Sequence, residues 1–204
     1  MGMAFTDARI DHADVRVALI DRRHGVGGHW LEAYPFVRLH QASAFYGVAS
    51  TLLGGNRVQT NGPEAGLHER ASVSEICSYY GSVLTERLLA SGQVEHFPGC
   101  EYLGDRTFRS RVSGKTYVVS DHCKVVDAHY LAPDIPAETP PPFVHGAHVL
   151  TPNALVRLDA AASQYVVVGS GKTATDPCLC LLDRRVAPGP RRRAPQRDTR
   201  PQAR

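Results

Sequence analysis

The residues whose types and spacing most clearly suggest chemistry lie at positions 164–176, which read Gln-Tyr-Val-Val-Val-Gly-Ser-Gly-Lys-Thr-Ala-Thr-Asp. Residues 165–168 form an uninterrupted, mostly β-branched run, the pattern of a strand buried on both faces. The run leads into the spacing G-x-G-x-x-A, and the following residues can start a helix. Such a strand–turn–helix corner presents free backbone N–H groups and the positive end of a helix dipole to a phosphate. Two interpretations stay open, a corner that binds a dinucleotide and a plain α/β corner without a ligand.

Each residue type of this corner has a physical role in the first interpretation. Gly169 would permit the tight turn, Gly171 would let a pyrophosphate approach the backbone, and Ala174 would let the helix pack on the strand. The predicted phosphate-binding residues are Gly169, Ser170, Gly171, Lys172, Thr173 and Ala174. Lys172 would either add a charge near a phosphate or lie in solvent. A Walker phosphate loop is excluded, because Val166 stands where that loop needs its first glycine.

A second candidate site follows another apolar run, at residues 15–20, which predicts a strand that ends at Asp21. A carboxylate at the end of a strand can accept hydrogen bonds from both ribose hydroxyls of an adenosine. Gly25, Gly27 and Gly28 come next with Trp30, and there the backbone could approach a flat ligand closely. The alternatives are a solvated strand end followed by a plain turn.

Other local patterns predict the elements that must position these residues. A helix is predicted over residues 73–90, with Ser72 and Glu75 as its capping box and Gly92 as its stop. The predicted strands cover residues 94–97, 106–112, 116–119 and 124–126, with a hairpin turn at 113–114. Five prolines predict a stiff connector at residues 132–143. Pro177 should disturb the helix that follows Gly171, at a cost of about 3 kcal/mol.

Composition narrows the class of protein. The 204 residues are 43% hydrophobic and 21% charged, with no apolar run of membrane-spanning length, which predicts a globular protein without a membrane partner. The five cysteines are an odd, dispersed set without metal or disulfide spacing, which predicts reduced thiols in a cytoplasmic protein. The formal charge of +3 arises from residues 183–204, because the rest has 15 Lys and Arg against 18 Asp and Glu. The body of the chain therefore does not favour a nucleic-acid partner, and the Arg/Pro-rich tail is predicted to be disordered.

Residues 21–30, Asp-Arg-Arg-His-Gly-Val-Gly-Gly-His-Trp, followed by Tyr34-Pro35, resemble the acidic residue, spacer and G-G-x-W motif of flavin-dependent monooxygenases. The resemblance extends to the second glycine motif and implies that the first segment binds FAD and the second NADP, as NADPH. It implies hydride transfer from NADPH to FAD and oxygenation of a small-molecule substrate, without a catalytic side chain or a metal. The residues implied in FAD binding are Asp21, Arg22, Gly27, Gly28, His29, Trp30 and Gln41.

The fold class implied by this resemblance is α/β, an incomplete Rossmann-type flavoprotein with two dinucleotide-binding domains and a small antiparallel β-meander. Residues 1–150 would form a partial FAD-binding domain, 151–182 the start of an NAD(P)-binding domain, and 183–204 the tail. Residues 2–7 would stand where the family has its first phosphate loop, with Ala4 and Asp7 at two of the glycine positions. This departure motivates a second hypothesis, a non-catalytic nucleotide-fold remnant or partner-binding fragment. The oligomeric state is left open.

Overall fold

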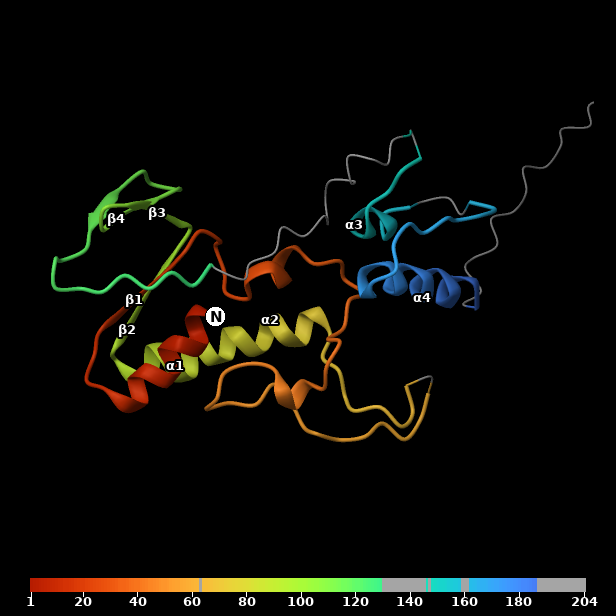
Figure 1. Ribbon diagram of the computed structural model, residues 1–204, viewed down its shortest axis with the longest axis horizontal. Helices are drawn as coiled ribbons and strands as arrows, with labels where there is room; N and C mark the ends of the chain where they lie inside the picture. Colours follow the sequence, from red (N-terminus) through yellow and green to blue (C-terminus); the bar gives the residue numbers. More distant parts are fainter. Residues whose placement is uncertain (63, 130–145, 147, 159–161, 187–204) are drawn as a thin grey trace, which may run out of the picture. The chain divides into compact units, whose positions relative to one another are not determined.

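The computed structural model describes residues 1–62, 64–129, 146, 148–158 and 162–186, which form a mixed α/β structure (Figure 1). Its contacts divide the chain into two compact units, residues 1–160 and residues 161–204. The proline-rich connector predicted at residues 132–143 lies outside the described residues. No helix in the described ranges has both the length and the apolar character needed to cross a membrane.

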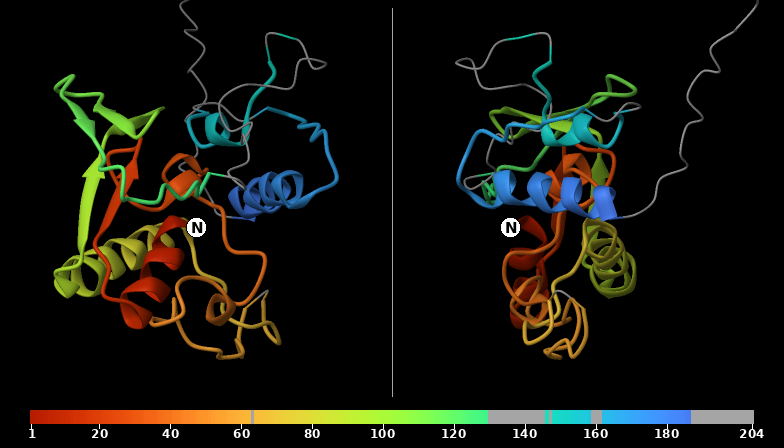
Figure 2. Two further views of the ribbon diagram at one scale, coloured as in Figure 1. Left: turned by 60° about the vertical axis from the view of Figure 1, so that its left-hand side comes forward. Right: turned by 90° about the vertical axis from the view of Figure 1, so that its right-hand side faces the viewer.

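A pair of parallel strands forms the centre of the first unit. Strand β1 (Val17–Asp21) pairs with β2 (Val94–Pro98), and the register runs from Val17 opposite Val94 to Asp21 opposite Pro98. Figure 2 shows the two strands side by side, with the helices α1 (Gly2–His12) and α2 (Val73–Ser82) next to them. One hydrophobic cluster joins these elements, and its buried members are Met3, Val48, Val83, Leu84, Leu88 and Val94. Because the strands are parallel, their carboxyl ends lie at the same edge.

The predicted long helix is confirmed. It begins at Val73 as α2, continues as a π-helical stretch, η3 (Val83–Leu88), and ends with a 3₁₀ turn, η4 (Leu89–Ser91). The capping box is present, since the Glu75 N–H donates to Ser72 Oγ at 3.4 Å and the Ser72 N–H donates to Glu75 Oε2 at 2.7 Å. Gly92 ends the helix in the left-handed conformation, with φ of 70°.

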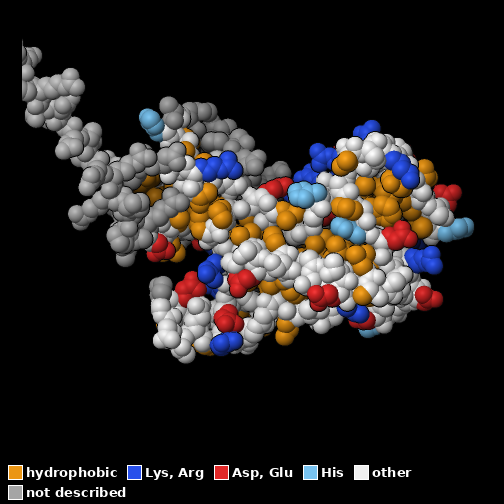
Figure 3. All heavy atoms as spheres, turned by 180° about the vertical axis from the view of Figure 1, so that it is seen from behind, with side chains coloured by type: hydrophobic (Ala, Val, Ile, Leu, Met, Phe, Trp, Pro, Cys, Tyr) orange, Lys and Arg blue, Asp and Glu red, His pale blue; other side chains and the backbone are white. Residues whose placement is uncertain are grey.

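The predicted antiparallel meander is also present. Strands β3 (Cys100–Gly104), β4 (Thr107–Ser110) and β5 (Thr116–Val118) pair in that order. The predicted strand at 94–97 is β2 of the parallel pair and not part of the meander. The predicted strand at 106–112 is three residues longer than β4, the one at 124–126 is not formed, and β3 was not predicted. The hairpin loop covers residues 111–115 because the Ser110 hydroxyl accepts the N–H groups of the next turn. Exposed hydrophobic side chains gather over this sheet (Figure 3), namely Leu103, Val112 and Val118.

The N-terminal residues form a helix, so residues 2–7, which stand where the resembled family has its first phosphate loop, are not a loop. Helix α1 buries Met3, Thr6 and Asp7, at the i, i+3, i+4 spacing of one helix face. Two of these three positions are polar, so the apolar periodicity that reveals an amphipathic helix was missing from the sequence. Asp7 therefore lies inside the structure rather than in a phosphate loop.

The second unit differs from its predicted strand–turn–helix corner in two ways. Residues 165–168 form no strand in the described structure, and Val166 and Val168 are 80% and 67% exposed, because no described strand pairs with them. Helix α4 (Lys172–Val186) runs through Pro177 without a break. Pro177 is the sixth residue of the helix, where it removes the one hydrogen bond to the Thr173 carbonyl, and the helix continues past it. The helix also includes residues 183–186 of the predicted tail, whose remainder is outside the described residues.

Candidate functional site

The candidate site of the first unit begins at Asp21, the last residue of β1 and a confirmed strand end. Asp21 Oδ1 accepts the N–H of Arg23 at 2.9 Å, whereas Oδ2 receives no hydrogen bond from the described residues. The carboxylate is partly exposed at the edge where both parallel strands end. One oxygen is thus used to hold the turn, and the other is available to a ligand.

The loop after Asp21 is closed by an arginine–carboxylate fork. Arg23 Nε donates to Glu32 Oε1 at 2.9 Å, and Arg23 Nη2 donates to Glu32 Oε2 at 2.8 Å. The Glu32 carboxylate raises the pKa of the Arg23 guanidinium, and the hydrogen bonds from Arg23 hold the pKa of Glu32 below its usual value. Asn153 supports the same corner by donating to the Glu32 carbonyl at 2.9 Å. The loop is therefore preorganised at both ends.

Two glycines of this loop have backbone conformations that other residues rarely adopt. Gly27 has φ of 126° and Gly28 has φ of 59°, at the start of the 3₁₀ helix η1 (Gly28–Glu32). A Cβ on Gly27 would lie 3.6 Å from Cys77 Sγ, so the loop packs on α2, while a Cβ on Gly28 would meet no atom within 4 Å. The backbone at Gly28 is thus open to a ligand.

Aromatic side chains pack around Trp30, in the loop that follows Asp21. Trp30 Nε1 donates to the Tyr46 hydroxyl at 2.6 Å, and the two rings meet edge to face with centroids 6.0 Å apart. The His29 ring lies 5.0 Å from the Trp30 ring. Burial and the positive charge of Arg23 lower the pKa of His29, which is therefore neutral at pH 7. Since the indole N–H is already bonded, Trp30 can contribute a surface for packing but not a free donor.

His96 is a residue that sequence reasoning missed. It lies opposite Leu19 in the register of β1 and β2, so it shares a face with Asp21, two residues further along. Its Nε2 is buried and has no hydrogen-bond partner among the described residues. Burial lowers the pKa of His96, against the opposing charge of Asp21. The sequence signal that could have identified His96 is a polar residue in the middle of the strand predicted at 94–97.

The structure brings together most of the residues predicted to bind FAD. Six of the seven lie on the continuous segment 21–32 that the Arg23–Glu32 fork closes, namely Asp21, Arg22, Gly27, Gly28, His29 and Trp30. The seventh is Gln41. Arg22 is exposed, and its carbonyl accepts a hydrogen bond from the Arg111 guanidinium at 3.3 Å. Gln41 is exposed on the next loop, where its amide donates to the Phe45 carbonyl at 3.1 Å; no described hydrogen bond joins it to the others.

The glycine corner of the second unit keeps its predicted turn. Gly169 has φ of 137°, and a Cβ there would lie 3.1 Å from the Ala174 Cβ, so both small residues are required for this close approach. The N–H groups of Ala174 and Thr175 both donate to the Gly171 carbonyl, at 2.9 and 3.1 Å. Lys172 forms an ion pair with Asp176 one helical turn later. The positive charge of Lys172 is thus partly neutralised by Asp176. Ser170 and Thr173 are the other two predicted residues of this corner.

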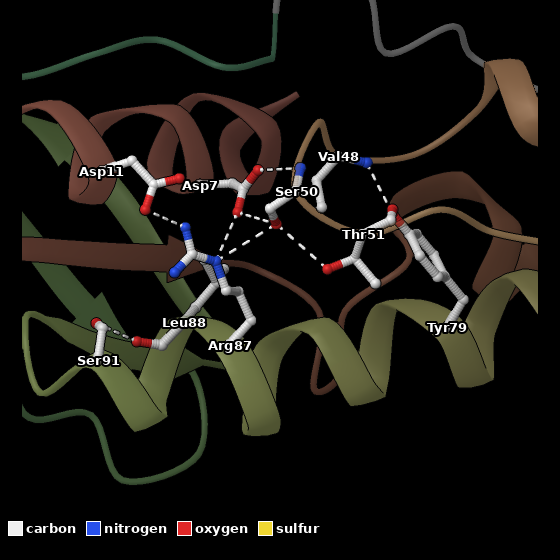
Figure 4. Close-up of polar contacts among 9 residues, drawn as sticks. All are labelled: Asp7, Asp11, Val48, Ser50, Thr51, Tyr79, Arg87, Leu88 and Ser91. Carbon is white, nitrogen blue, oxygen red and sulfur yellow. Dashed lines mark hydrogen bonds and ion pairs between the residues drawn. The ribbon is translucent and has the colours of Figure 1, made fainter.

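A buried polar network supports the first unit (Figure 4). The Asp7 carboxylate, 1% exposed, accepts hydrogen bonds from Ser50 Oγ at 2.6 Å, from the Ser50 N–H at 3.1 Å and from Arg87 Nε at 3.1 Å. Arg87 Nη2 also donates to Asp11 at 2.5 Å. The network ties α1, the loop around Ser50 and the long helix together. The network stabilises the fold of the first unit, and it contains none of the predicted site residues.

Comparison with known proteins adds relatives but no function. No family model and no solved structure matches the chain. Over 190 residues the chain is 48% identical to the uncharacterized protein Rv2000 of Mycobacterium tuberculosis, and equally to the uncharacterized protein Mb2023 of Mycobacterium bovis. Each alignment covers 92% of this chain and 35% of the relative, so the chain spans about a third of the length of the curated relatives it matches.

Proposed function

We propose that this chain is part of an FAD- and NAD(P)H-dependent oxidoreductase of monooxygenase type that acts on a small-molecule substrate. One observation carries the proposal: Asp21 ends a parallel strand with one carboxylate oxygen free, and a preorganised glycine turn follows at once. In dinucleotide-binding folds an acidic residue at this place accepts the ribose hydroxyls. We also propose that this strand end belongs to a Rossmann-type dinucleotide-binding domain.

The residues around Asp21 fit an adenosine dinucleotide. Asp21 Oδ2 would accept from the ribose, and the open backbone at Gly28 would allow close approach of the ligand. The unpartnered Nε2 of His96 on the same face is a buried polar atom that calls for a partner. Trp30, held by Tyr46, would border the flavin side and help to exclude water. Bound FAD and NADPH would supply the redox chemistry, hydride transfer followed by oxygenation.

The glycine corner of the second unit would hold the phosphates of NADPH. The supporting observations are the positive φ of Gly169, its close approach to Ala174 and the helix that begins at Lys172. The N–H groups of the first helical turn lack intrahelical partners and face an anion favourably. Asp176 would compete with a phosphate for Lys172, so we assign the main role to the backbone.

A second candidate function, partner binding without turnover, is favoured by one observation. Val166 and Val168 are exposed and unpaired, so the predicted core strand of a nucleotide-binding domain is not formed within the described residues. A remnant of this kind would retain the fold of the first unit without binding either cofactor.

Titration of the purified chain with FAD distinguishes the two candidates. We expect flavin fluorescence to be quenched on binding, and Asp21→Asn to weaken the affinity about tenfold or more, because a charge-assisted hydrogen bond contributes about 1.5–3 kcal/mol. Glu95→Gln is the matched control, because it removes an exposed carboxylate from the same sheet without touching the site. Protein that stays colourless and leaves FAD fluorescence unchanged would support the second candidate.

A further inference from the structure

Arg23 lies two residues after the strand end at Asp21, and its positive charge affects which nucleotide the site accepts. Arg23 donates its backbone N–H to Asp21, so its position relative to the carboxylate is defined. In dinucleotide-binding folds a carboxylate here selects a free ribose 2′-hydroxyl, whereas a nearby arginine accommodates a 2′-phosphate. The segment Asp21-Arg22-Arg23 contains both kinds of residue, so the sequence alone does not define the preference.

The structure shows how Arg23 is engaged. Its side chain is 19% exposed and uses both Nε and Nη2 in the fork with Glu32, at 2.9 and 2.8 Å. A two-point fork of this kind is the geometry with which arginine binds a carboxylate or a phosphate, and one guanidinium edge serves one such partner. Glu32 therefore occupies the Nε–Nη2 edge of the Arg23 guanidinium and offsets the positive charge that would attract a 2′-phosphate. Its negative charge would also repel a phosphate placed there.

We propose that Glu32 determines the nucleotide selectivity of the Asp21 site: by occupying Arg23, it restricts the site to adenosine nucleotides with a free 2′-hydroxyl. This inference rests on the proposed function of the site. Glu32 is a positioning residue, since it acts through Arg23 and also fixes the loop between them. Releasing Arg23 should convert a site for 5′-ADP and FAD into one that also takes a 2′-phosphorylated nucleotide.

The test compares the binding of 5′-ADP and adenosine 2′,5′-bisphosphate by isothermal titration calorimetry. For the wild type we expect 5′-ADP to bind more tightly, by about tenfold or more. In Glu32→Gln the ratio of the two dissociation constants should move about tenfold toward the bisphosphate, because the freed guanidinium gains a dianionic partner. Adding Arg23→Ala to Glu32→Gln should abolish this gain. High salt should reduce it.

Glu64→Gln is the matched control, because Glu64 forms a comparable pair with Arg70 at 2.5 Å outside the site. It should leave the ratio unchanged. A ratio that Glu32→Gln does not alter, while 5′-ADP still binds, would overturn this inference and leave the proposed function standing. A gain that persists after Arg23→Ala would also overturn it, since another cation would then be responsible. A wild type that binds neither nucleotide would overturn both proposals. Thermal unfolding of Glu32→Gln and of the double variant with Arg23→Ala checks that each is folded.

Discussion

Asp7 keeps its negative charge in a buried position because donors from two distant segments converge on it. Burial by itself would raise the pKa of this carboxyl, but hydrogen bonds from the Ser50 hydroxyl and N–H and the ion pair with Arg87 outweigh it, so the pKa is lowered. The folded state therefore binds the Asp7 proton more weakly than the unfolded state does. Such a group contributes stability above its unfolded pKa, and this contribution is lost as the pH falls through the folded value.

This gives a pH-dependent prediction for the residue. Asp7→Asn should lower the free energy of unfolding at pH 7 by about 2 kcal/mol, a value reduced because Arg87 is 30% exposed and keeps Asp11 as a partner. The difference between wild type and variant should shrink as the pH falls below about 4, because the Asp7 carboxyl of the unfolded chain then begins to protonate, and it should be lost at the lower pH where the folded carboxyl protonates as well. Urea unfolding at several pH values measures both quantities.

The control for this prediction is Asp11→Asn. Asp11 contacts the same arginine but is 49% exposed, so its loss should cost less than about 1 kcal/mol. Equal losses for the two variants, or a wild-type–variant difference that is constant down to pH 2.5, would contradict the buried, charged state of Asp7.

The loop that follows η2 (Ser43–Phe45) shows how elements hold one another in this fold. The Tyr79 hydroxyl of α2 donates to the Thr51 carbonyl at 2.6 Å and accepts the Val48 N–H at 2.7 Å. The ring can reach both groups only because position 47 is glycine: a Cβ there would lie 2.3 Å from the Tyr79 oxygen. The Tyr79 side chain and the Asp7 network thus hold the loop on its two sides (Figure 4).

Gly47→Ala should therefore be severely destabilising. The new methyl group would displace Tyr79 and break both of its hydrogen bonds, and φ of 120° is unfavourable for alanine. We expect the free energy of unfolding to fall by about 3 kcal/mol or more. Gly62→Ala is the control, because Gly62 also has a positive φ, 80°, but open space around it, and should cost about 1 kcal/mol. A loss no larger for Gly47→Ala than for Gly62→Ala would refute the proposed steric cause.

At the scale of helices and strands, patterns within a few neighbouring residues of the sequence predicted the elements best. The helix from Val73 follows from apolar residues at helical spacing and from a capping box within four residues of its start. The hairpin between β4 and β5 follows from two β-rich runs around Gly114. Strand β3 was missed because its residues alternate poorly and its order comes from pairing with β4. The prediction of a strand at 165–168 was wrong for the opposite reason: its local pattern is strong, but no described strand pairs with it.

At the scale of the whole molecule, ligand binding should be coupled to the stability of the first unit. The proposed site joins β1, β2 and the loop to Glu32, all of which belong to residues 1–160. A ligand that binds only the folded state stabilises it by about 2.7 kcal/mol at one hundred times its dissociation constant. We therefore expect 5′-ADP at this excess to raise the unfolding midpoint of the chain by several degrees.

Inorganic phosphate at the same ionic strength is the control for this measurement, because it lacks the ribose that Asp21 would hold. The midpoint shift with 5′-ADP should largely disappear in Asp21→Asn. A shift of equal size with phosphate, or one that Asp21→Asn leaves intact, would show that the stabilisation does not arise at the proposed ribose site.

Only some features of the candidate site could be predicted from local sequence patterns. The run before Asp21 and the glycines after it were enough to predict a strand end followed by a tight turn, because each depends on the backbone preferences of a few neighbouring residues. The fork between Arg23 and Glu32 and the unpartnered His96 on the adjacent strand were not predictable in this way. They depend on how a loop folds back and which strand pairs with β1.

The sequence by itself thus determined the capped helix, the hairpin and the two glycine turns, because hydrogen bonds and φ angles within a few residues decide these features. Only the tertiary structure decided that residues 2–12 form a helix, that Asp7 is buried and charged, and that Asp21 and His96 share a face. These outcomes depend on contacts between segments far apart in the chain: Asp7 stays charged when buried because Ser50 and Arg87 satisfy it, and the pairing of β1 with β2 brings Asp21 and His96 to one face.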